Sequence, residues 1–267
     1  MRSQTNPFKA KMASGEVQHG LWLGLPDNSV AEIIASAGFD WLLIDAEHAP
    51  FDLRTILAHL QAMAPYDVAP IVRPVEGDTA LLKQMLDIGA QTLLIPMVED
   101  AEQAKALVRA VRYPPDGIRG LGTSLARAAC WNGIPGYLKK ANEEICLLVQ
   151  VETENALNNL DEIIAVDGVD GVFIGPSDLS ASMGYIGDAG HPVVVEAISE
   201  GLKKIRAAGK YAGLLSLDPY LSQTYIEAGA NFVGAGVDTL LLANAARALA
   251  KKLKGEESAP EKPQAGY

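Results

Sequence analysis

Residues 37–45 read Ala-Gly-Phe-Asp-Trp-Leu-Leu-Ile-Asp, and this stretch decides the fold because its pattern recurs along the chain. The same order, a glycine followed by a short apolar run, returns at residues 88–96 (IGAQTLLIP), 167–175 (DGVDGVFIG) and 228–236 (AGANFVGAG). A glycine of this kind suits the left-handed residue that ends a helix. A nearly continuous apolar run is typical of a strand buried on both faces of a parallel sheet. The repeat therefore indicates successive β/α units.

Eight apolar runs can be counted in the 267 residues. We expect strands near residues 20–25, 41–45, 71–73, 92–97, 146–151, 171–174, 212–215 and 232–235. Segments 78–88 and 101–111 have clear helical patterns with an aspartate near the start. Eight units in about 250 residues favour a single-domain (β/α)8 TIM barrel over residues 1–254. A doubly wound sheet is the alternative, but residues 26–29 (PDNS) replace the glycine-rich loop that usually follows its first strand.

Composition limits the partners of this chain. It has 22 basic and 33 acidic residues, a net charge of −11, so nucleic acid and anionic membranes are not expected as partners. No apolar run approaches the roughly 18 residues of a membrane span, and residues 1–11 have no hydrophobic signal core. Two well-separated cysteines form no metal or disulfide pattern, which favours a reduced, cytoplasmic protein. The polar residues 255–267 are expected to form a flexible tail.

Polar residues gather where the predicted strands end, which is the catalytic face of a TIM barrel. Glu152 and Asp178 follow neighbouring strands, so their carboxylates can meet, and two oxygen ligands suit Mg²⁺ or Mn²⁺. Gln150 lies two residues before Glu152 and faces the same side of its strand. The seventh predicted strand ends at Leu215, which should therefore lie on the same face as these polar residues. A surface role for both carboxylates, as helix caps or salt-bridge partners, stays open from spacing alone.

Among the four histidines, His48 is the one that follows a strand end. It could act as a general base, with Asp45 orienting its ring. His191, in a long loop on the same face, is its main rival. His19 precedes the first predicted strand and should lie at the opposite face, and His59 sits within a helical pattern and should pack against the core.

Arg73 ends the third predicted strand, where a fixed guanidinium can bind a carboxylate. An internal salt bridge to Asp45 or Glu152 is the alternative. No lysine falls at a strand end on this face, which excludes a Schiff base. Carbonyl chemistry here would therefore need a metal.

Five motifs occur together and in one order: WLLIDAEHAP (41–50), IVRP (71–74), RYPPDGIRG (112–120), LLVQVE (147–152) and GVFIGPSDLSASMG (171–184). Because of these motifs, the chain resembles the HpcH/HpaI family of metal-dependent pyruvate aldolases. The resemblance extends from about residue 8 to residue 253. Segments 20–25, 126–135 and 147–152 are most similar to the branch that cleaves 4-hydroxy-2-oxoheptanedioate to pyruvate and succinate semialdehyde, in the catabolism of aromatic compounds. A sugar-acid aldolase of the 2-dehydro-3-deoxyglucarate type is the alternative. An acyl-CoA lyase of the citrate or malyl-CoA type, or a non-catalytic barrel, fits less well.

This resemblance also implies roles for individual residues. It implies that Glu152 and Asp178 bind a divalent metal ion (Mg²⁺, Mn²⁺ or Co²⁺) that pyruvate chelates. Gln150 and the backbone around Gly175, Ser177 and Asp178 would hold the pyruvate carboxylate, with Leu215 beside them. His48, supported by Asp45, would move the proton of the aldol hydroxyl, and Arg73 would stabilise the enolate oxygen. The family often has Gly at position 46 and Ala at position 177, where this chain has Ala and Ser.

The resemblance further implies a homo-hexamer, a trimer of dimers. Asp87 matches a family position that approaches the active site of a neighbouring subunit. The apolar segment 240–253 (LLLANAARALAKKL) would form a terminal helix that packs between subunits.

Overall fold

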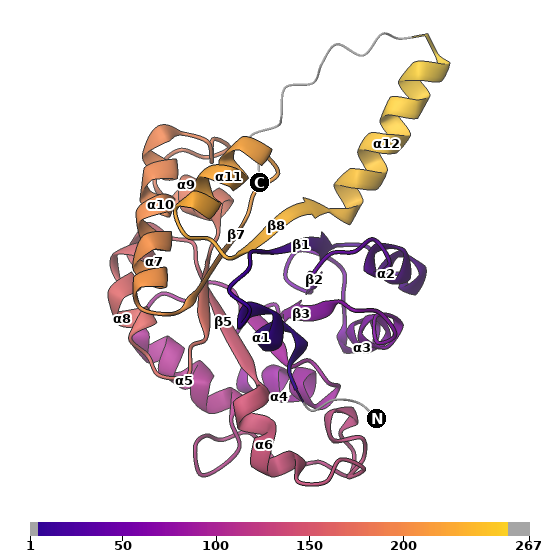
Figure 1. Cartoon of the computed structure of the whole chain (residues 1–267), viewed down its shortest axis with the longest axis vertical. Coiled ribbons are helices and arrows are strands. Elements are labelled where there is room, and N and C mark those ends of the chain that lie inside the picture. Colours follow the sequence, from indigo (N-terminus) through magenta and orange to yellow (C-terminus); the bar gives the residue numbers. More distant parts are fainter. Residues whose placement is uncertain (1–4, 256–267) are drawn as a thin grey trace.

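The computed structural model describes residues 5–255 and shows a closed barrel of eight parallel strands in chain order (Figure 1). Strand β8 pairs with β1 and closes the barrel. The strands are β1 (Gln18–Leu23), β2 (Trp41–Asp45), β3 (Ala69–Arg73), β4 (Thr92–Ile95), β5 (Cys146–Val151), β6 (Gly171–Ile174), β7 (Tyr211–Leu215) and β8 (Phe232–Val237). The predicted (β/α)8 barrel is confirmed, and the open doubly wound sheet is excluded.

Helices connect the strands and cover the outside of the barrel (Figure 1). The two predicted helices are α4 (Thr79–Asp87) and α5 (Ala101–Val111), and the carboxylates of Asp78 and Asp100 cap their N-termini. The others are α1 (Pro7–Met12), α2 (Asn28–Ala35), α3 (Leu53–Ala62), η1 (Arg127–Ala129), α6 (Tyr137–Glu144), α7 (Glu154–Asn158), α8 (Leu160–Ile164), α9 (Pro176–Ser182), α10 (Pro192–Ala207), α11 (Pro219–Glu227) and α12 (Asp238–Leu253).

Two strands end earlier than predicted. Strand β1 stops at Leu23 because the carboxylate of Asp238 accepts the backbone N–H groups of Gly24 and Leu25, at 2.8 and 3.1 Å. Strand β4 stops at Ile95, two residues before the predicted end, because Met97 turns into the left-handed region with φ 53°. An apolar pattern does not show where a strand ends when apolar residues continue into the following turn.

Aromatic rings fill the inside of the barrel, and glycines on the strands make room for them. Trp22, Trp41, Phe173 and Phe232 form one buried cluster there, with ring centroids 5.5 to 6.2 Å apart. A Cβ on Gly20 would collide with the Trp41 ring. A second, larger cluster joins the outer faces of the strands to the helices. The barrel is thus a packed core, and its chemistry is confined to its ends.

Helix α12 extends away from the barrel (Figure 1). Asp238, its first residue, is buried, whereas Leu241, Leu242, Leu249 and Leu253 are between 53% and 79% exposed. Apart from Gly255, the predicted flexible tail lies outside the described residues. None of the helices within residues 5–255 combines the length and the apolar character needed to cross a membrane.

We predict that Gly20→Ala destabilises the barrel by about 1–3 kcal/mol, the usual cost of overpacking a core. The new methyl group would overlap the ring of Trp41, which is buried within the aromatic cluster. Urea unfolding at equilibrium measures the effect. Gly190→Ala is the matched control, because its Cβ would meet Leu221 at an ordinary 3.7 Å. Equal stability of the two variants would contradict the packing argument.

Candidate active site

A cavity of about 700 Å³ opens at the carboxyl ends of the strands. Nine of the ten predicted site residues line it, and Asp87 does not. The nine are Asp45, His48, Arg73, Gln150, Glu152, Gly175, Ser177, Asp178 and Leu215. The strand-end argument therefore brought together residues that are up to 170 positions apart in the sequence.

Arg73 is held from several sides at the end of β3. Its Nε and Nη2 donate to the two carboxylate oxygens of Asp45 at 2.9 and 2.7 Å. Its Nη1 donates to Oε1 of Gln150 at 3.4 Å, and the guanidinium lies 5.9 Å from the ring centroid of Trp22. Burial opposes the charge on Arg73, but the hydrogen bonds and charges of Asp45 and Glu47 outweigh it and raise its pKa. Arg73 therefore remains a fixed cation in the pocket.

Glu152 continues the same chain of contacts. Gln150 accepts from Arg73 and donates through Nε2 to Oε2 of Glu152 at 2.9 Å. The backbone N–H of Met97 donates to Oε1 of Glu152 at 2.8 Å. Gln150 thus connects Arg73 with Glu152, and its expected contact with the substrate carboxylate stays a prediction.

The carboxylate of Glu152 is buried among other acidic groups. Burial raises its pKa to about 7, and the negative charges of Glu47 and Asp178 act in the same direction. Asp178 is exposed in the first turn of α9. Gly175 leaves space for this carboxylate, because a Cβ there would lie 2.6 Å from Oε2 of Glu152.

This donor set fits a divalent cation. No group of three or more His, Cys, Asp or Glu side chains within residues 5–255 is arranged as a complete metal site. Glu152 and Asp178 instead offer oxygen ligands at an open pocket, which leaves coordination positions for substrate and water. A cation would also offset the excess of negative charge around Glu152.

Two residues of the site were missed by the sequence analysis. Trp22, the last residue but one of β1, places its ring beneath Arg73; the sequence analysis gave it no role at the site. Glu47 has Oε2 2.9 Å from Nη1 of Arg73 and 3.8 Å from Nε2 of His48. Burial raises the pKa of Glu47 against the opposing charge of Arg73. The sequence offered one indication that Glu47 belongs to the site, because Glu47 directly precedes His48.

Asp45 does not orient the ring of His48, contrary to our prediction. Its carboxylate is engaged by Arg73, and Oδ1 additionally accepts the backbone N–H of Glu47 and that of His48, at 3.1 and 3.4 Å. The carboxylate nearest to the imidazole is that of Glu47. The salt bridge between Arg73 and Asp45, left open as an alternative, is therefore present.

The other histidines have structural surroundings. His191 caps α10, with Nδ1 accepting the N–H of Val193, and its ring stacks on Tyr185 at 3.9 Å. His59 is buried, as predicted, within hydrogen-bonding distance of two carbonyls. His19 lies within β1, not before it, in its amino-terminal half. His48 alone lines the pocket, with a side chain that is 63% exposed.

Asp87 ends α4 and forms a 2.8 Å ion pair with the buried Arg119. It is therefore outside the pocket of its own chain. The predicted approach to a neighbouring subunit is compatible with this position and stays a prediction.

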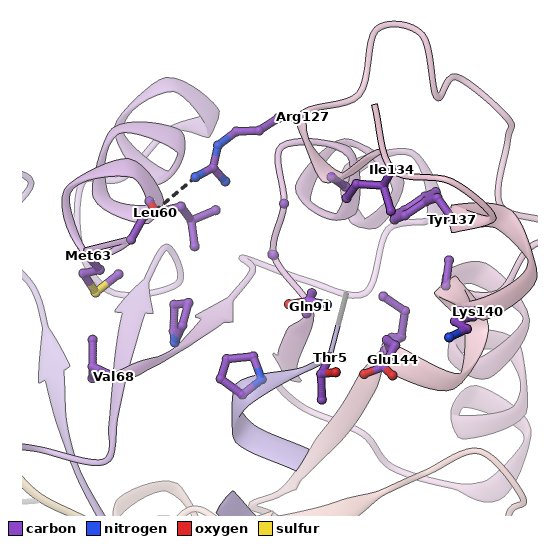
Figure 2. Close-up of a pocket in the computed structure, with 18 of the residues that line it drawn as sticks. Thr5, Leu60, Met63, Val68, Gln91, Arg127, Ile134, Tyr137, Lys140 and Glu144 are labelled. Atoms are coloured by element: carbon purple, nitrogen blue, oxygen red, sulfur yellow. Dashed lines mark hydrogen bonds between the residues drawn. The ribbon is translucent and has the colours of Figure 1, made fainter. Parts of the chain in front are cut away.

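Figure 2 shows the residues that line a second cavity, of about 280 Å³. Residues just before β4 and β5 line it, together with the ends of α3 and α6. The guanidinium of Arg127 donates there to the carbonyl oxygens of Leu60 and Ile88, at 3.2 and 2.9 Å. Arg127 therefore satisfies carbonyl groups at the ends of two helices.

The fold and the pocket together define a TIM-barrel enzyme whose acidic, basic and imidazole groups converge at the strand ends. The sequence comparison is more specific, since residues 18–245 match the family model described as HpcH/HpaI aldolase/citrate lyase. The chain belongs to this family.

Named relatives cover nearly the whole chain. A hydroxypyruvate/pyruvate aldolase of Pseudomonas aeruginosa is 59% identical over 98% of both chains. A 4-hydroxy-2-oxo-heptane-1,7-dioate aldolase of Escherichia coli is 55% identical, over 95% of this chain and 97% of the relative. Among solved structures, an HpcH/HpaI aldolase/citrate lyase family protein from Burkholderia cenocepacia J2315 has 37% identity and a TM-score of 0.88, and covers 94% of this chain and 100% of that one.

We predict that the metal-free protein loses stability as the pH rises from about 4.5 to about 7, because of Glu152. Its pKa is about 7 in the folded chain, against an ordinary 4.5. The folded state therefore binds a proton that the unfolded chain releases, and this contribution is complete below the lower value and lost above the higher one. Denaturant unfolding at about pH 5 and about pH 8 should show a smaller fall in the unfolding free energy for Glu152→Gln than for the wild type.

The exposed substitution Glu227→Gln is the control for this comparison and should follow the wild type. The same pH dependence in the wild type and in Glu152→Gln would show that Glu152 does not titrate abnormally.

Proposed function

We propose that this chain is a divalent-metal-dependent aldolase that reversibly cleaves 4-hydroxy-2-oxo acids to a small 2-oxo acid and an aldehyde. The observation that carries the proposal is the convergence of Glu152 and Asp178 with the fixed cation Arg73 in one pocket. No lysine of residues 5–255 lines that pocket, so the carbonyl cannot be activated as a Schiff base there.

Glu152 and Asp178 would hold the metal ion. Bound there, such an ion supplies Lewis-acid polarisation of the substrate's 2-oxo group. Arg73 directs positive charge toward the oxygen that becomes an enolate as the C3–C4 bond breaks, where preorganised charge lowers the barrier most. Asp45 and Gln150 keep the guanidinium in place. Gly175, Ser177 and Leu215 form the wall that would receive the carboxylate and methyl group of the 2-oxo acid.

His48 would take the proton from the C4 hydroxyl during cleavage and return it in the condensation direction. An exposed imidazole at the pocket mouth suits this role because its ordinary pKa lies close to neutral pH. The carboxylate of Glu47 lies 3.8 Å from Nε2 of His48 and is the acidic group closest to the ring.

The names of the relatives support a three-carbon 2-oxo acid as the donor product, pyruvate or hydroxypyruvate. Succinate semialdehyde, the product expected from 4-hydroxy-2-oxoheptanedioate, is the first aldehyde to test, in keeping with a role in aromatic catabolism. Strong selectivity for a polyhydroxylated aldehyde would favour the sugar-acid alternative. Cleavage of an acyl-CoA ester would favour the citrate/malyl-CoA type.

We further propose that the enzyme is a cytoplasmic homo-hexamer, a trimer of dimers. The exposed leucines of α12 form an apolar face on a projecting helix, and burial of such a face against a second subunit would be favourable. In that assembly Asp87 would reach the active site of a neighbour.

We predict that EDTA abolishes turnover and that Mg²⁺, Mn²⁺ or Co²⁺ restores it. The assay incubates the protein with succinate semialdehyde and either pyruvate or hydroxypyruvate, and follows the 4-hydroxy-2-oxo acid by chromatography. Glu152→Ala and Asp178→Ala should both lose metal binding in calorimetry. Full activity in EDTA, or inactivation by borohydride in the presence of pyruvate, would overturn the proposal.

We predict that His48→Ala slows aldol cleavage by about 10²–10⁴-fold, the usual range for a lost general acid or base. His191→Asn should be close to the wild type, because asparagine can still cap α10. Steady-state kinetics of both variants decide between the two histidines. The reverse ranking would assign the proton transfer to His191.

A further inference from the structure

The backbone of Met97 has an unusual conformation next to the proposed metal site. Its φ is 53°, a left-handed value that residues other than glycine rarely adopt. Its side chain is 47% exposed and borders an open groove with Pro96 and Gln103. Packing of the side chain therefore does not explain the strained backbone, which points to the peptide groups instead.

Several hydrogen bonds hold this turn. Gln103, in the first turn of α5, donates to the carbonyl of Met97 at 3.1 Å and accepts the N–H of Glu99 at 2.9 Å. The N–H of Val98 donates to the carbonyl of Gln150 at 3.0 Å. The carboxylate of Glu99 accepts from the hydroxyl of Thr153 at 2.8 Å. These bonds connect the turn after β4 with the end of β5 and the residues that follow it, among them Glu152.

The result of this arrangement is one well-placed donor. The N–H of Met97 donates to Oε1 of Glu152 at 2.8 Å, while Gln150 donates to Oε2 at 2.9 Å. Each carboxylate oxygen thus receives one internal donor. The remaining lone pairs are available to the pocket, and rotation of the carboxylate would break one of the two bonds.

We propose that Met97 is a positioning residue for Glu152, and that its left-handed backbone is retained because it directs the N–H at Oε1. This inference rests on the proposed function, since it assigns Glu152 to the metal. Outer hydrogen bonds of this kind orient ligating carboxylates, and their loss typically lowers metal affinity by about 10–100-fold.

Two substitutions at the same exposed position test the proposal. Met97→Val places a β-branched residue where φ is positive, so the backbone should relax and withdraw its N–H. Met97→Gly removes the same side chain but adopts positive φ freely. Titration with Mn²⁺ in the absence of substrate, by calorimetry, should show affinity about tenfold or more weaker in Met97→Val. Met97→Gly should stay within about twofold of the wild type.

Trp131 provides the matched control, because it also has φ 53° and an exposed side chain but lies outside the pocket. Trp131→Val and Trp131→Gly should differ in thermal stability and agree in Mn²⁺ affinity. If Met97→Val does not fold, Gln103→Ala takes its place, because it removes the two hydrogen bonds that hold this turn, and Mn²⁺ affinity should again fall.

The outcomes are distinguishable. A wild type that binds Mn²⁺ together with equal affinities for Met97→Val and Met97→Gly would overturn this inference and leave the proposed function intact. Equal weakening in both variants would mean that the Met97 side chain, not its backbone, matters, which also contradicts the inference. A wild type that does not bind Mn²⁺ at all would overturn the proposed function itself.

Discussion

The bidentate ion pair between Arg73 and Asp45 is the interaction on which the rest of the site depends. Because both groups are buried at strand ends, neither can lose its partner without leaving a charge in a poorly solvated place. With Nε and Nη2 occupied by Asp45, only Nη1 remains to contact Gln150 and approach Glu47. The position of the guanidinium then determines where Gln150, and through it Glu152, can lie.

The parallel barrel makes this chain of contacts possible. Side chains alternate along a strand, so Gln150 and Glu152 point to the same side. Neighbouring parallel strands end at one edge, which brings Asp45 beside Arg73 in the pairing of β2 with β3. The aromatic cluster below closes the barrel interior, and Trp22 presents its ring to Arg73 from that cluster. The charged groups thus rest on a packed apolar layer and remain open to solvent on one side only.

Sequence reasoning predicted the features that depend on periodicity. Buried strands and the residues after them follow from apolar runs, so the barrel and nine residues of the pocket were found. It did not predict features that depend on a single backbone angle or on a choice among nearby partners. The left-handed turn at Met97 ends β4 earlier than predicted. Asp45 lies close to both Arg73 and His48, and the sequence analysis paired it with the ring of His48 when its carboxylate in fact binds Arg73. Asp87 could not be placed because its expected partner belongs to another subunit.

The balance of charge in the pocket also bears on the class of function. The carboxylates of Asp45, Glu47 and Glu152 lie near the guanidinium of Arg73, and Asp178 adds a fourth carboxylate near Glu152, in a chain whose net charge is −11. Such a pocket would repel the carboxylate of a 2-oxo acid at neutral pH. A protein that merely bound organic acids would gain nothing from Glu152 and Asp178, since removing them would improve the attraction. Their presence is understandable if they hold a divalent cation, because that cation supplies the positive charge that attracts the substrate carboxylate. The arrangement therefore favours a metal-dependent enzyme over a non-catalytic binding barrel.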